Sequence, residues 1–554
     1  MIKLSILLCS FIVVAWGQPA RSSLFSICAA SFGYALFWKI LPIDLKRKAR
    51  FWISTFWFAV VQCAQLSWMF TTEYHGAYII FVALFLAIVL GMQFGLLTLL
   101  VPIAPPFALA ASWTLLEWAR QYVLCGFPWN PVGLALTGTI WSLQCASLLG
   151  IYGLSLWVIW TNVRAVQAKR AYAHGLWLGM AFLPYLFGAF HVHFHKKQLE
   201  KSPKQNVALV QTGLLPEEKF LWPGRHESYL DVFVQWGRII NALKNSGMDR
   251  NNWKKDATQL KTDSSSSSRL SSQGMILFPE TALPFSAETP LCSQQIARAF
   301  FSAHYGEEVL AHFPAIDEDE PITNLFFARV LASLYNADVF LGLIHEDPET
   351  HLFTNAAFLV GKEGILGRYD KNILFPIAEA RPFPWLRWIA RFYGIHFFFE
   401  KGTHFDPLET IATSICYEET FPAFMRKMAK KGARFFVNLT NDGFFPFSSL
   451  AEQHFTHGLV RSVENGIPLL RACNTGITAV VDSLGRIGAR LGKKGTHVDR
   501  ASGVLLTTIA EYRYATLYAF IGDIGIIILG CTGFLILFSS WILLHPRNFK
   551  NRPK

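Results

Sequence analysis

Apolar stretches fill both ends of the chain, and a more polar stretch with a finer alternation lies between them. Long apolar runs occur near 4–17, 23–42, 51–70, 77–101, 107–124, 140–162, 174–194 and 517–544. A helix needs about 20 mostly apolar residues to cross the hydrocarbon core of a bilayer. The pattern therefore predicts about eight membrane-spanning helices, seven before the polar stretch and one after it.

The first apolar run has a second interpretation. Lys3, a short apolar run and Ala15-Trp16-Gly17 also resemble a cleavable signal peptide. Because further apolar runs follow at once, we expect a helix that is retained.

Between about 205 and 510, short runs of β-forming residues alternate with polar stretches of helical pattern. The runs predict strands at Val207–Gln211, Met275–Phe278, Val339–Ile344, Asn355–Val360, Ile411–Cys416, Phe435–Leu439, Leu469–Cys473 and Thr478–Asp482. Strands separated by helices indicate an α/β domain of layered sheets and helices. We therefore expect membrane helices at 1–195, a folded domain at 196–516, and a last membrane helix with a basic tail at 517–554.

The composition supports a membrane protein. Hydrophobic residues make up 52% of the 554 positions and charged residues only 16%, and the mean hydropathy is +0.31. Soluble domains have about 25% charged residues, so a disordered or ordinary cytosolic protein is excluded. The net charge of +12 could indicate nucleic acid. However, many basic residues cluster beside apolar runs and no phosphate-binding glycine loop occurs, so we expect no nucleic-acid partner.

The basic residues predict how the chain crosses the membrane, because cytoplasmic loops carry an excess of Lys and Arg. With a cytoplasmic N-terminus, the inside loops and the tail hold Lys46, Arg47, Lys48, Arg50, Arg164, Lys169, Arg170, Arg547, Lys550, Arg552 and Lys554. The short outside loops hold little beyond Arg21. This topology places residues from about 195 to 516 outside the cytoplasm.

Ionisable residues inside membrane spans are costly and often functional. Glu117 and Arg120 lie three residues apart in the fifth predicted span and can share one helix face. We expect an internal ion pair, with a lipid headgroup contact as the alternative. The following Gly126-Phe127-Pro128-Trp129 predicts an interfacial turn, with Trp129 at headgroup depth.

The cysteine pattern predicts neither a disulfide framework nor a metal centre. Six of the nine cysteines lie in or beside apolar runs, and the folded domain holds Cys292, Cys416 and Cys473, an odd number. No CxxC or Cys/His cluster has the spacing of a metal site. We expect no metal and no cofactor.

Three short motifs in the folded domain carry reactive side chains. Glu280 follows an apolar strand in Phe278-Pro279-Glu280-Thr281, Lys371 lies in Arg368-Tyr369-Asp370-Lys371, and Cys416 ends a strand in Ser414-Ile415-Cys416-Tyr417-Glu418. A carboxylate can take the proton of a thiol, and an ammonium can stabilise the thiolate or an oxyanion. Taken singly, each residue also fits a structural role: a turn residue, a solvated charge and a buried thiol. Spacing along the chain does not show whether the three meet.

These motifs resemble the Glu–Lys–Cys signature of the nitrilase superfamily. With the flanking helices, the whole chain resembles the apolipoprotein N-acyltransferase family of bacterial membrane enzymes. Further matching stretches are 126–129, Asn438-Leu439-Thr440-Asn441-Asp442, Gln453-His454, and 461–478 with Pro468-Leu469-Leu470-Arg471. The resemblance implies a nitrilase-like αββα sandwich on an eight-helix membrane body. It also implies the bacterial inner membrane, with the catalytic domain facing the periplasm.

The resemblance further implies the reaction and its partners. A phospholipid, typically phosphatidylethanolamine, would donate an acyl chain to the N-terminal amine of an S-diacylglyceryl cysteine on an apolipoprotein. Carried over by motif, Glu280 is the general base, Lys371 the oxyanion-stabilising cation and Cys416 the nucleophile that forms a thioester. Glu379, Tyr417 and Glu418 match supporting residues, and Trp222 matches a functional tryptophan on a mobile loop, with a hydrophobic surface anchor as its alternative role.

The chain departs from the family pattern at several places. Gly443-Phe444-Phe445-Pro446-Phe447 stands where the family usually has a tryptophan, so this loop is expected to contact lipid differently. The serine-rich stretch Asp263–Ser272 and the acidic segment Asp317–Glu320 look like additions, and Phe397-Phe398-Phe399 is either core or a membrane-surface contact.

Two other functions compete with acyl transfer. A membrane-tethered amidase or nitrile hydrolase would use the same three residues with water as the acceptor, but small soluble substrates need no membrane body. A non-catalytic scaffold or transporter would predict damaged motifs or polar, broken helices at the midplane. The motifs are intact, and the spans show little polarity beyond Glu117 and Arg120.

Overall fold

The computed structural model describes residues 2–42, 44–123, 126–222, 224–248, 274–315, 320–376, 379–380, 399–491 and 501–544. Contacts divide the chain into two compact units. The first unit holds Met1–Lys196, Val463–Gly466 and Ala515–Lys554, and the second holds Lys197–Ser462 and Ile467–Tyr514. The serine-rich stretch, residues 317–319 of the acidic segment, Phe397-Phe398 and the basic C-terminal tail lie outside the described residues.

The first unit is helical, and every apolar run of the sequence falls on a helix. Its main helices are α1 (Ile2–Gly17), the continuous stretch α2–η1–α3 (Ser23–Ile40), α4 (Arg47–Gln65), α5 (Tyr78–Leu100), α6 (Pro106–Ala119), α8 (Ala146–Gln167), α9 (Ala171–Lys201) and α19 (Ile524–Leu544). Four of these, Ser23–Ile40, α5, α8 and α9, are long and apolar enough to cross a membrane. The total of eight spans stays a prediction.

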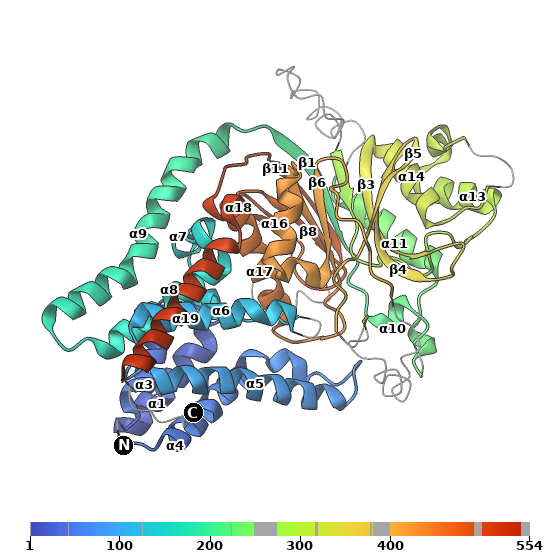
Figure 1. Ribbon diagram of the computed structural model, residues 1–554. Coiled ribbons are helices and arrows are strands. Elements are labelled where there is room, and N and C mark those ends of the chain that lie inside the picture. Colours follow the sequence, from blue (N-terminus) through green and yellow to red (C-terminus); the bar gives the residue numbers. More distant parts are fainter. Residues whose placement is uncertain are drawn as a thin grey trace, which may run out of the picture. The chain divides into compact units, whose positions relative to one another are not determined.

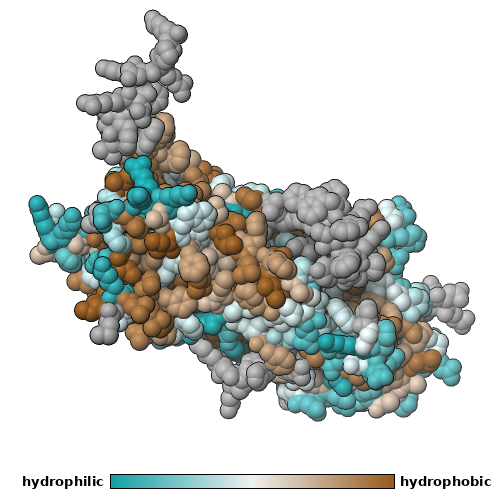
Figure 2. All heavy atoms as spheres, turned by 90° about the horizontal axis from the view of Figure 1, so that it is seen from below, coloured by the Kyte–Doolittle hydropathy of each residue, from teal (hydrophilic) through white to brown (hydrophobic). Residues whose placement is uncertain are grey.

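Large apolar side chains point outward from these helices. Phe81 and Phe85 of α5 are 73% and 60% exposed, and Phe182 and Phe190 of α9 are 68% and 69% exposed. Figure 2 shows brown, hydrophobic side chains gathered over the helical unit. Exposed apolar surface of this extent is unfavourable in water and is typical of a lipid-facing surface.

A buried polar network lies inside the helical unit, which the hydrophobic pattern did not predict. The Asn130 amide donates to Gln62 Oε1 (3.1 Å) and to Gln65 Oε1 (2.6 Å). Gln18 donates to the Asn130 carbonyl (3.1 Å), and the Tyr34 hydroxyl donates to Gln18. Because unsatisfied polar groups are costly in an apolar environment, these mutual hydrogen bonds hold the turn after α6 against α4 and the end of α1.

The two predictions for this turn region have different outcomes. Arg120 Nη2 lies 3.5 Å from Glu117 Oε1, which confirms the internal ion pair. Glu117 Oε1 also accepts the Val132 backbone N–H at 2.9 Å. The Trp129 ring is 2% exposed and packs 5.1 Å from the ring of Trp68, and its position at headgroup depth stays a prediction.

The second unit is a sandwich of two sheets (Figure 1). The six-stranded sheet has the order β11 (Gly503–Ala510), β1 (Lys204–Gln211), β2 (Gly274–Leu277), β3 (Ala337–Glu346), β4 (Phe353–Gly361) and β5 (Gly364–Asp370). The five-stranded sheet has the order β10 (Ile487–Arg490), β9 (Ala479–Val481), β8 (Leu469–Cys473), β7 (Phe435–Thr440) and β6 (Ile411–Ile415). The central strands β1–β2–β3 and β6–β7–β8 pair in parallel.

Side-chain alternation along the strands builds two cores. Val207 and Leu209 of β1 pack toward the second sheet, in one core with Val437 and Leu439 of β7. The intervening Ala208 and Val210 join a second core. That core includes side chains of α11 (Val232–Asn245), α13 (Gln294–Tyr305) and α14 (Asn324–Tyr335). Helices α16 (Pro422–Lys430) and α17 (Leu450–Asn465) accompany the other sheet (Figure 1). This arrangement confirms the predicted αββα sandwich.

All eight predicted strands occur, with ends shifted by a few residues, but three strands were not predicted. These are β5, β10 and β11, and each lies at an edge of its sheet. An edge strand pairs on one side only, and most residues of these three are partly or fully exposed. β5 and β10 therefore lack the continuous apolar pattern that marks a buried strand, whereas β11 has a largely apolar sequence that the prediction missed.

Candidate active site

The three predicted reactive residues lie directly after strands. Glu280 follows β2 by three residues, Lys371 comes immediately after β5, and Cys416 comes immediately after β6 and begins the turn η8 (Cys416–Thr420). The first two belong to one sheet and the third to the other. Stacking of the sheets brings strand ends from both together, which sequence spacing does not reveal.

Lys371 binds two carboxylates. Its Nζ lies 3.0 Å from Glu280 Oε1 and 2.8 Å from Glu379 Oε1, and the lysine side chain is only 1% exposed. Burial by itself lowers the pKa of Lys371, but the charges of Glu280 and Glu379 outweigh burial and raise its pKa well above the usual range. The residue is therefore a fixed cation and not a proton donor at neutral pH.

Asn355 completes this group, although its role was not recognised in the sequence. Its Nδ2 donates to Glu280 Oε1 (2.8 Å) and to Glu379 Oε1 (3.2 Å). The backbone N–H of Phe375 donates to the other Glu379 oxygen at 2.7 Å. Asn355 lies within the apolar strand β4, and a buried amide in such a strand was the available signal. The two carboxylates thus share one cation and one amide.

Cys416 has a strained backbone beside this group. Its φ is +51°, a left-handed conformation that costs a residue other than glycine about 1–2 kcal/mol. Desolvation and the charge of Glu280 raise the pKa of the Cys416 thiol well above its ordinary value, and the charge of Lys371 opposes this. The resting thiol is protonated, so it needs a base to become a nucleophile.

Glu418 connects the cysteine turn to the lysine loop. Its Oε2 accepts the Ile415 N–H (2.7 Å) and the Tyr369 hydroxyl (2.8 Å), and its Oε1 accepts the N–H groups of Asn372 (2.6 Å) and Ile373 (2.9 Å). Burial outweighs the opposing effect of these hydrogen bonds and raises the pKa of Glu418 to about 7. Glu418 therefore positions the two loops relative to each other.

The side chain of Tyr417 packs against neighbouring aromatic rings. Its buried ring makes edge contacts with Phe375 at 5.2 Å and with Phe421 at 5.3 Å between ring centroids. Phe375 in turn packs against Phe445 at 6.3 Å. The Tyr417 ring thereby fixes the backbone beside the nucleophile.

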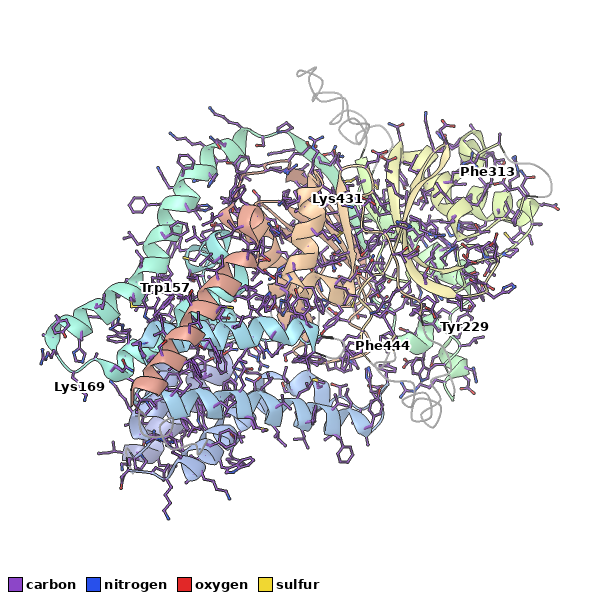
Figure 3. All side chains as sticks on the ribbon, in the orientation of Figure 1. Trp157, Lys169, Tyr229, Phe313, Lys431 and Phe444 are labelled. Atoms are coloured by element: carbon purple, nitrogen blue, oxygen red, sulfur yellow. The ribbon has the colours of Figure 1, made fainter. Side chains whose placement is uncertain are left out.

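Trp222 lies on the loop between α10 (Pro216–Lys219) and η5 (His226–Ser228). Its half-buried ring is 6.3 Å from that of Phe444, which is labelled in Figure 3, and nearby Leu221 and Phe447 are 63% and 55% exposed. This ring contact joins the Trp222 loop to the Phe444 loop. This small apolar surface fits either a substrate contact or a surface anchor.

Lys219, immediately before this loop, was also missed. Its Nζ is buried 3.3 Å from the Glu280 carbonyl and 3.4 Å from Thr281 Oγ1. Burial lowers the pKa of Lys219 to about 7, against the opposing charge of Glu280. No motif marked this lysine, and only tertiary packing shows that it supports the Glu280 backbone.

Among the described residues, one cluster has side-chain types that bind metals: Cys416, Asp442 and His454, whose ligand atoms lie within 4.8 Å of one another. His454 Nδ1 bonds to Asp442 Oδ1 (2.9 Å), and Nε2 bonds to the Cys416 carbonyl (3.2 Å). Both ring nitrogens thus take part in hydrogen bonds within the protein.

A two-sheet sandwich with a glutamate, a lysine and a cysteine after its strands defines a carbon–nitrogen hydrolase type of domain. The family model for carbon-nitrogen hydrolases matches residues 246–514, and the model for the apolipoprotein N-acyltransferase N-terminal domain matches residues 10–164. A structure of a nitrilase-superfamily protein from Saccharomyces cerevisiae is 15% identical and covers 58% of this chain and 94% of its own, with a TM-score of 0.33.

Curated relatives cover nearly the whole chain. The apolipoprotein N-acyltransferase of Chlamydia trachomatis serovar D is 30% identical over 95% of this chain and 94% of its own length. That of Chlamydia caviae is 28% identical over 96% and 97%. The chain belongs to the apolipoprotein N-acyltransferase family and is a membrane-bound acyltransferase.

Proposed function

We propose that this chain transfers an acyl chain from a phospholipid to the N-terminal amine of an S-diacylglyceryl cysteine on an apolipoprotein. Family membership supports a lipid donor and a lipoprotein acceptor in general. Phosphatidylethanolamine is the proposed donor. We further propose that residues 1–195 and the last helix of 517–554 lie in the bacterial inner membrane, that the basic tail is cytoplasmic, and that the catalytic domain, 196–516, faces the periplasm.

The observation that carries the chemistry is the buried group of Lys371 with Glu280 and Glu379, close enough to Cys416 to shift the pKa of its thiol. Glu280 is the proposed general base, because the thiol is protonated at rest and cannot attack an ester unaided. Glu379 and Asn355 hold Lys371 and Glu280 in place. Lys371, permanently charged, is the proposed oxyanion-stabilising group.

The reaction proceeds in two half-reactions. Glu280 takes the proton of Cys416, and the thiolate attacks the acyl ester carbonyl of the phospholipid. Lys371 and the Tyr417 backbone N–H stabilise the tetrahedral oxyanion. The lysophospholipid leaves with the proton from Glu280, and a thioester remains on Cys416.

The lipoprotein amine then loses a proton to Glu280 and attacks the thioester. The tetrahedral intermediate collapses to the amide, the C–S bond breaks, and the departing Cys416 thiolate takes the proton from Glu280. One nucleophile that serves two substrates in turn predicts ping-pong kinetics. Both substrates carry acyl chains, so a membrane body avoids drawing these chains into water.

Intact mass spectrometry of the full chain in detergent with phosphatidylethanolamine tests this proposal. We expect a fatty-acyl mass increment that hydroxylamine removes, present in the wild type and absent in Cys416→Ala. A folded wild-type protein without an adduct, after several phospholipids have been tried, would overturn the thioester mechanism.

The acceptor is tested separately on the acyl-enzyme. A diacylglyceryl peptide with a free N-terminus should discharge the thioester, whereas its N-acetylated counterpart should not. Equal discharge in buffer alone would favour the amidase type of reaction, in which water is the acceptor.

A further inference from the structure

A ring of four buried, ionisable side chains lies behind Cys416. Asp442 follows β7, His454 lies on α17, Arg471 lies in β8 and Glu419 lies in the turn after Cys416. The side chains are at most 5% exposed. None of the four has a role in the mechanism above.

The contacts close the ring. His454 Nδ1 lies 2.9 Å from Asp442 Oδ1, and His454 Nε2 lies 3.2 Å from Glu419 Oε1. Arg471 Nε lies 3.0 Å from the same Glu419 oxygen, and Arg471 Nη2 lies 3.7 Å from Asp442 Oδ2. Carboxylates and basic groups therefore alternate around the ring.

This arrangement indicates the hydrogen-bond roles of the two His454 nitrogens. Both ring nitrogens face carboxylate or carbonyl oxygens, so each is best satisfied as an N–H donor. Burial opposes ionisation of Asp442, but His454 and Arg471 outweigh it and lower its pKa, in agreement with an ionised carboxylate.

The ring contacts the nucleophile through its backbone. The Cys416 carbonyl accepts from His454 Nε2 at 3.2 Å and from Asn438 Nδ2 at 3.3 Å. Cys416 is also the residue with the left-handed φ of +51°. A hydrogen bond from a buried, oriented side chain fixes the direction of this carbonyl, and it favours the strained conformation that presents the thiol.

We propose that His454 is a positioning residue for the reaction. Its hydrogen bond from Nε2 to the Cys416 carbonyl keeps the Cys416 backbone in the reactive left-handed conformation. The other members of the ring, Asp442, Glu419 and Arg471, hold the His454 side chain in place. The inference rests on the proposed function of Cys416 as the nucleophile. This proposal gives the ring a role beyond packing, because the hydrogen bond from His454 Nδ1 to Asp442 orients the imidazole whose Nε2 contacts the Cys416 carbonyl.

Two neutral replacements separate the two nitrogens of His454. A glutamine amide reaches the position of Nε2 and can donate to the Cys416 carbonyl, whereas an asparagine amide reaches only the position of Nδ1 and can donate to Asp442. The readout is the single-turnover rate of acyl-enzyme formation on Cys416 in the full chain with phosphatidylethanolamine, with the half-saturating lipid concentration and the melting temperature measured in parallel. Glu452→Gln is the matched control, because this side chain is exposed on the same helix.

We expect His454→Asn to lose about 100-fold in rate, the size of effect that misplacement of a reactive group produces, and His454→Gln to lose about tenfold or less. The half-saturating lipid concentration should stay within about twofold for both, because the effect is on the nucleophile and not on lipid binding. Glu452→Gln should match the wild type.

Equal rates for the two His454 variants, or a greater loss in His454→Gln, would overturn the proposal and leave a structural role. Losses that follow the melting temperature would do the same. Absence of the adduct in the wild type would instead overturn the thioester mechanism, so the two failures are distinguishable.

Discussion

At the scale of single residues, the site is distinguished by buried charges that have partners. Lys371 is surrounded by two carboxylates, and Glu418 receives four hydrogen bonds. Removal of one member of such a group leaves a buried charge without its partner, which is more costly than loss of an exposed ion pair. Lys219 is the exception, since its Nζ faces a carbonyl and a hydroxyl rather than a carboxylate oxygen.

Lys219 gives a pH dependence of stability. Burial lowers its folded-state pKa from 10.5 to about 7. At pH values between these two pKa values, the unfolded chain binds a proton that the native chain does not bind. The free energy of unfolding therefore increases as the pH rises. The contribution is present above the unfolded pKa and is lost as pH falls through the folded pKa.

We expect the stability of the wild type relative to Lys219→Met to increase steadily from pH 7 to pH 10, because methionine cannot titrate. Denaturant midpoints followed by tryptophan fluorescence measure this difference. The exposed Lys362→Met serves as the control and should show no such trend. A difference that stays flat or falls with pH would contradict the depressed pKa.

At the scale of elements, the strands that the sequence predicted are mostly buried, and this includes β6, which is buried along its length although it lies at a sheet edge. The interior strands β2 and β7 are buried at every position because both of their faces are covered. The unpredicted β5, which carries Lys371 at its end, is an edge strand with several exposed positions. The sequence therefore identified the lysine motif but not the strand that positions it.

Gly342 in β3 shows how closely two elements meet at the site. A Cβ at this position would lie 2.4 Å from the Pro279 carbonyl oxygen and 2.8 Å from Glu280 Cα. These are backbone atoms, so they cannot move aside as the end of a flexible side chain would. Gly342 also accepts the Ala282 N–H at 2.7 Å, which fixes the loop that carries the general base.

We expect Gly342→Ala to displace Glu280 and to lower the rate of thioester formation by about 100-fold, with a loss of stability of about 1–3 kcal/mol. Rates from intact mass and a thermal melt measure the two effects. Gly488→Ala in β10 is the control, since its Cβ would meet only the Val480 carbonyl at 3.7 Å. If Gly342→Ala and Gly488→Ala have equally small effects on the rate and the melting temperature, the prediction is wrong and the Glu280 loop tolerates displacement.

At the scale of the whole molecule, membrane attachment and topology decide which compartment receives the product. The apolar faces of α5 and α9 account for attachment, and the basic loops of the sequence predict which side is cytoplasmic. Lys169, between α8 and α9, and Lys431, after α16, are both exposed and lie in different units (Figure 3). They therefore suit a test of the orientation.

We expect a membrane-impermeant maleimide to label Lys431→Cys in cells whose outer membrane has been permeabilised, and to label Lys169→Cys only after the inner membrane is opened. The physical reason is the predicted cytoplasmic position of the basic loop at Lys169. The protein without these substitutions serves as the control, because it shows how much maleimide labels the native cysteines. Labelling of Lys169→Cys first would reverse the proposed topology.

The sequence by itself determined the helical apolar segments, the interior strands and the three reactive residue types, because each depends on local pattern or on a contiguous motif. It also led, through resemblance, to the family. Tertiary structure alone decided which charges meet. Lys371 shares its two carboxylates with Asn355, a residue inside a strand, and His454 reaches the Cys416 carbonyl from a helix 38 residues further along the chain. Such contacts depend on how strands pair within a sheet and on how α17 packs against its sheet, and no periodicity within a segment encodes them.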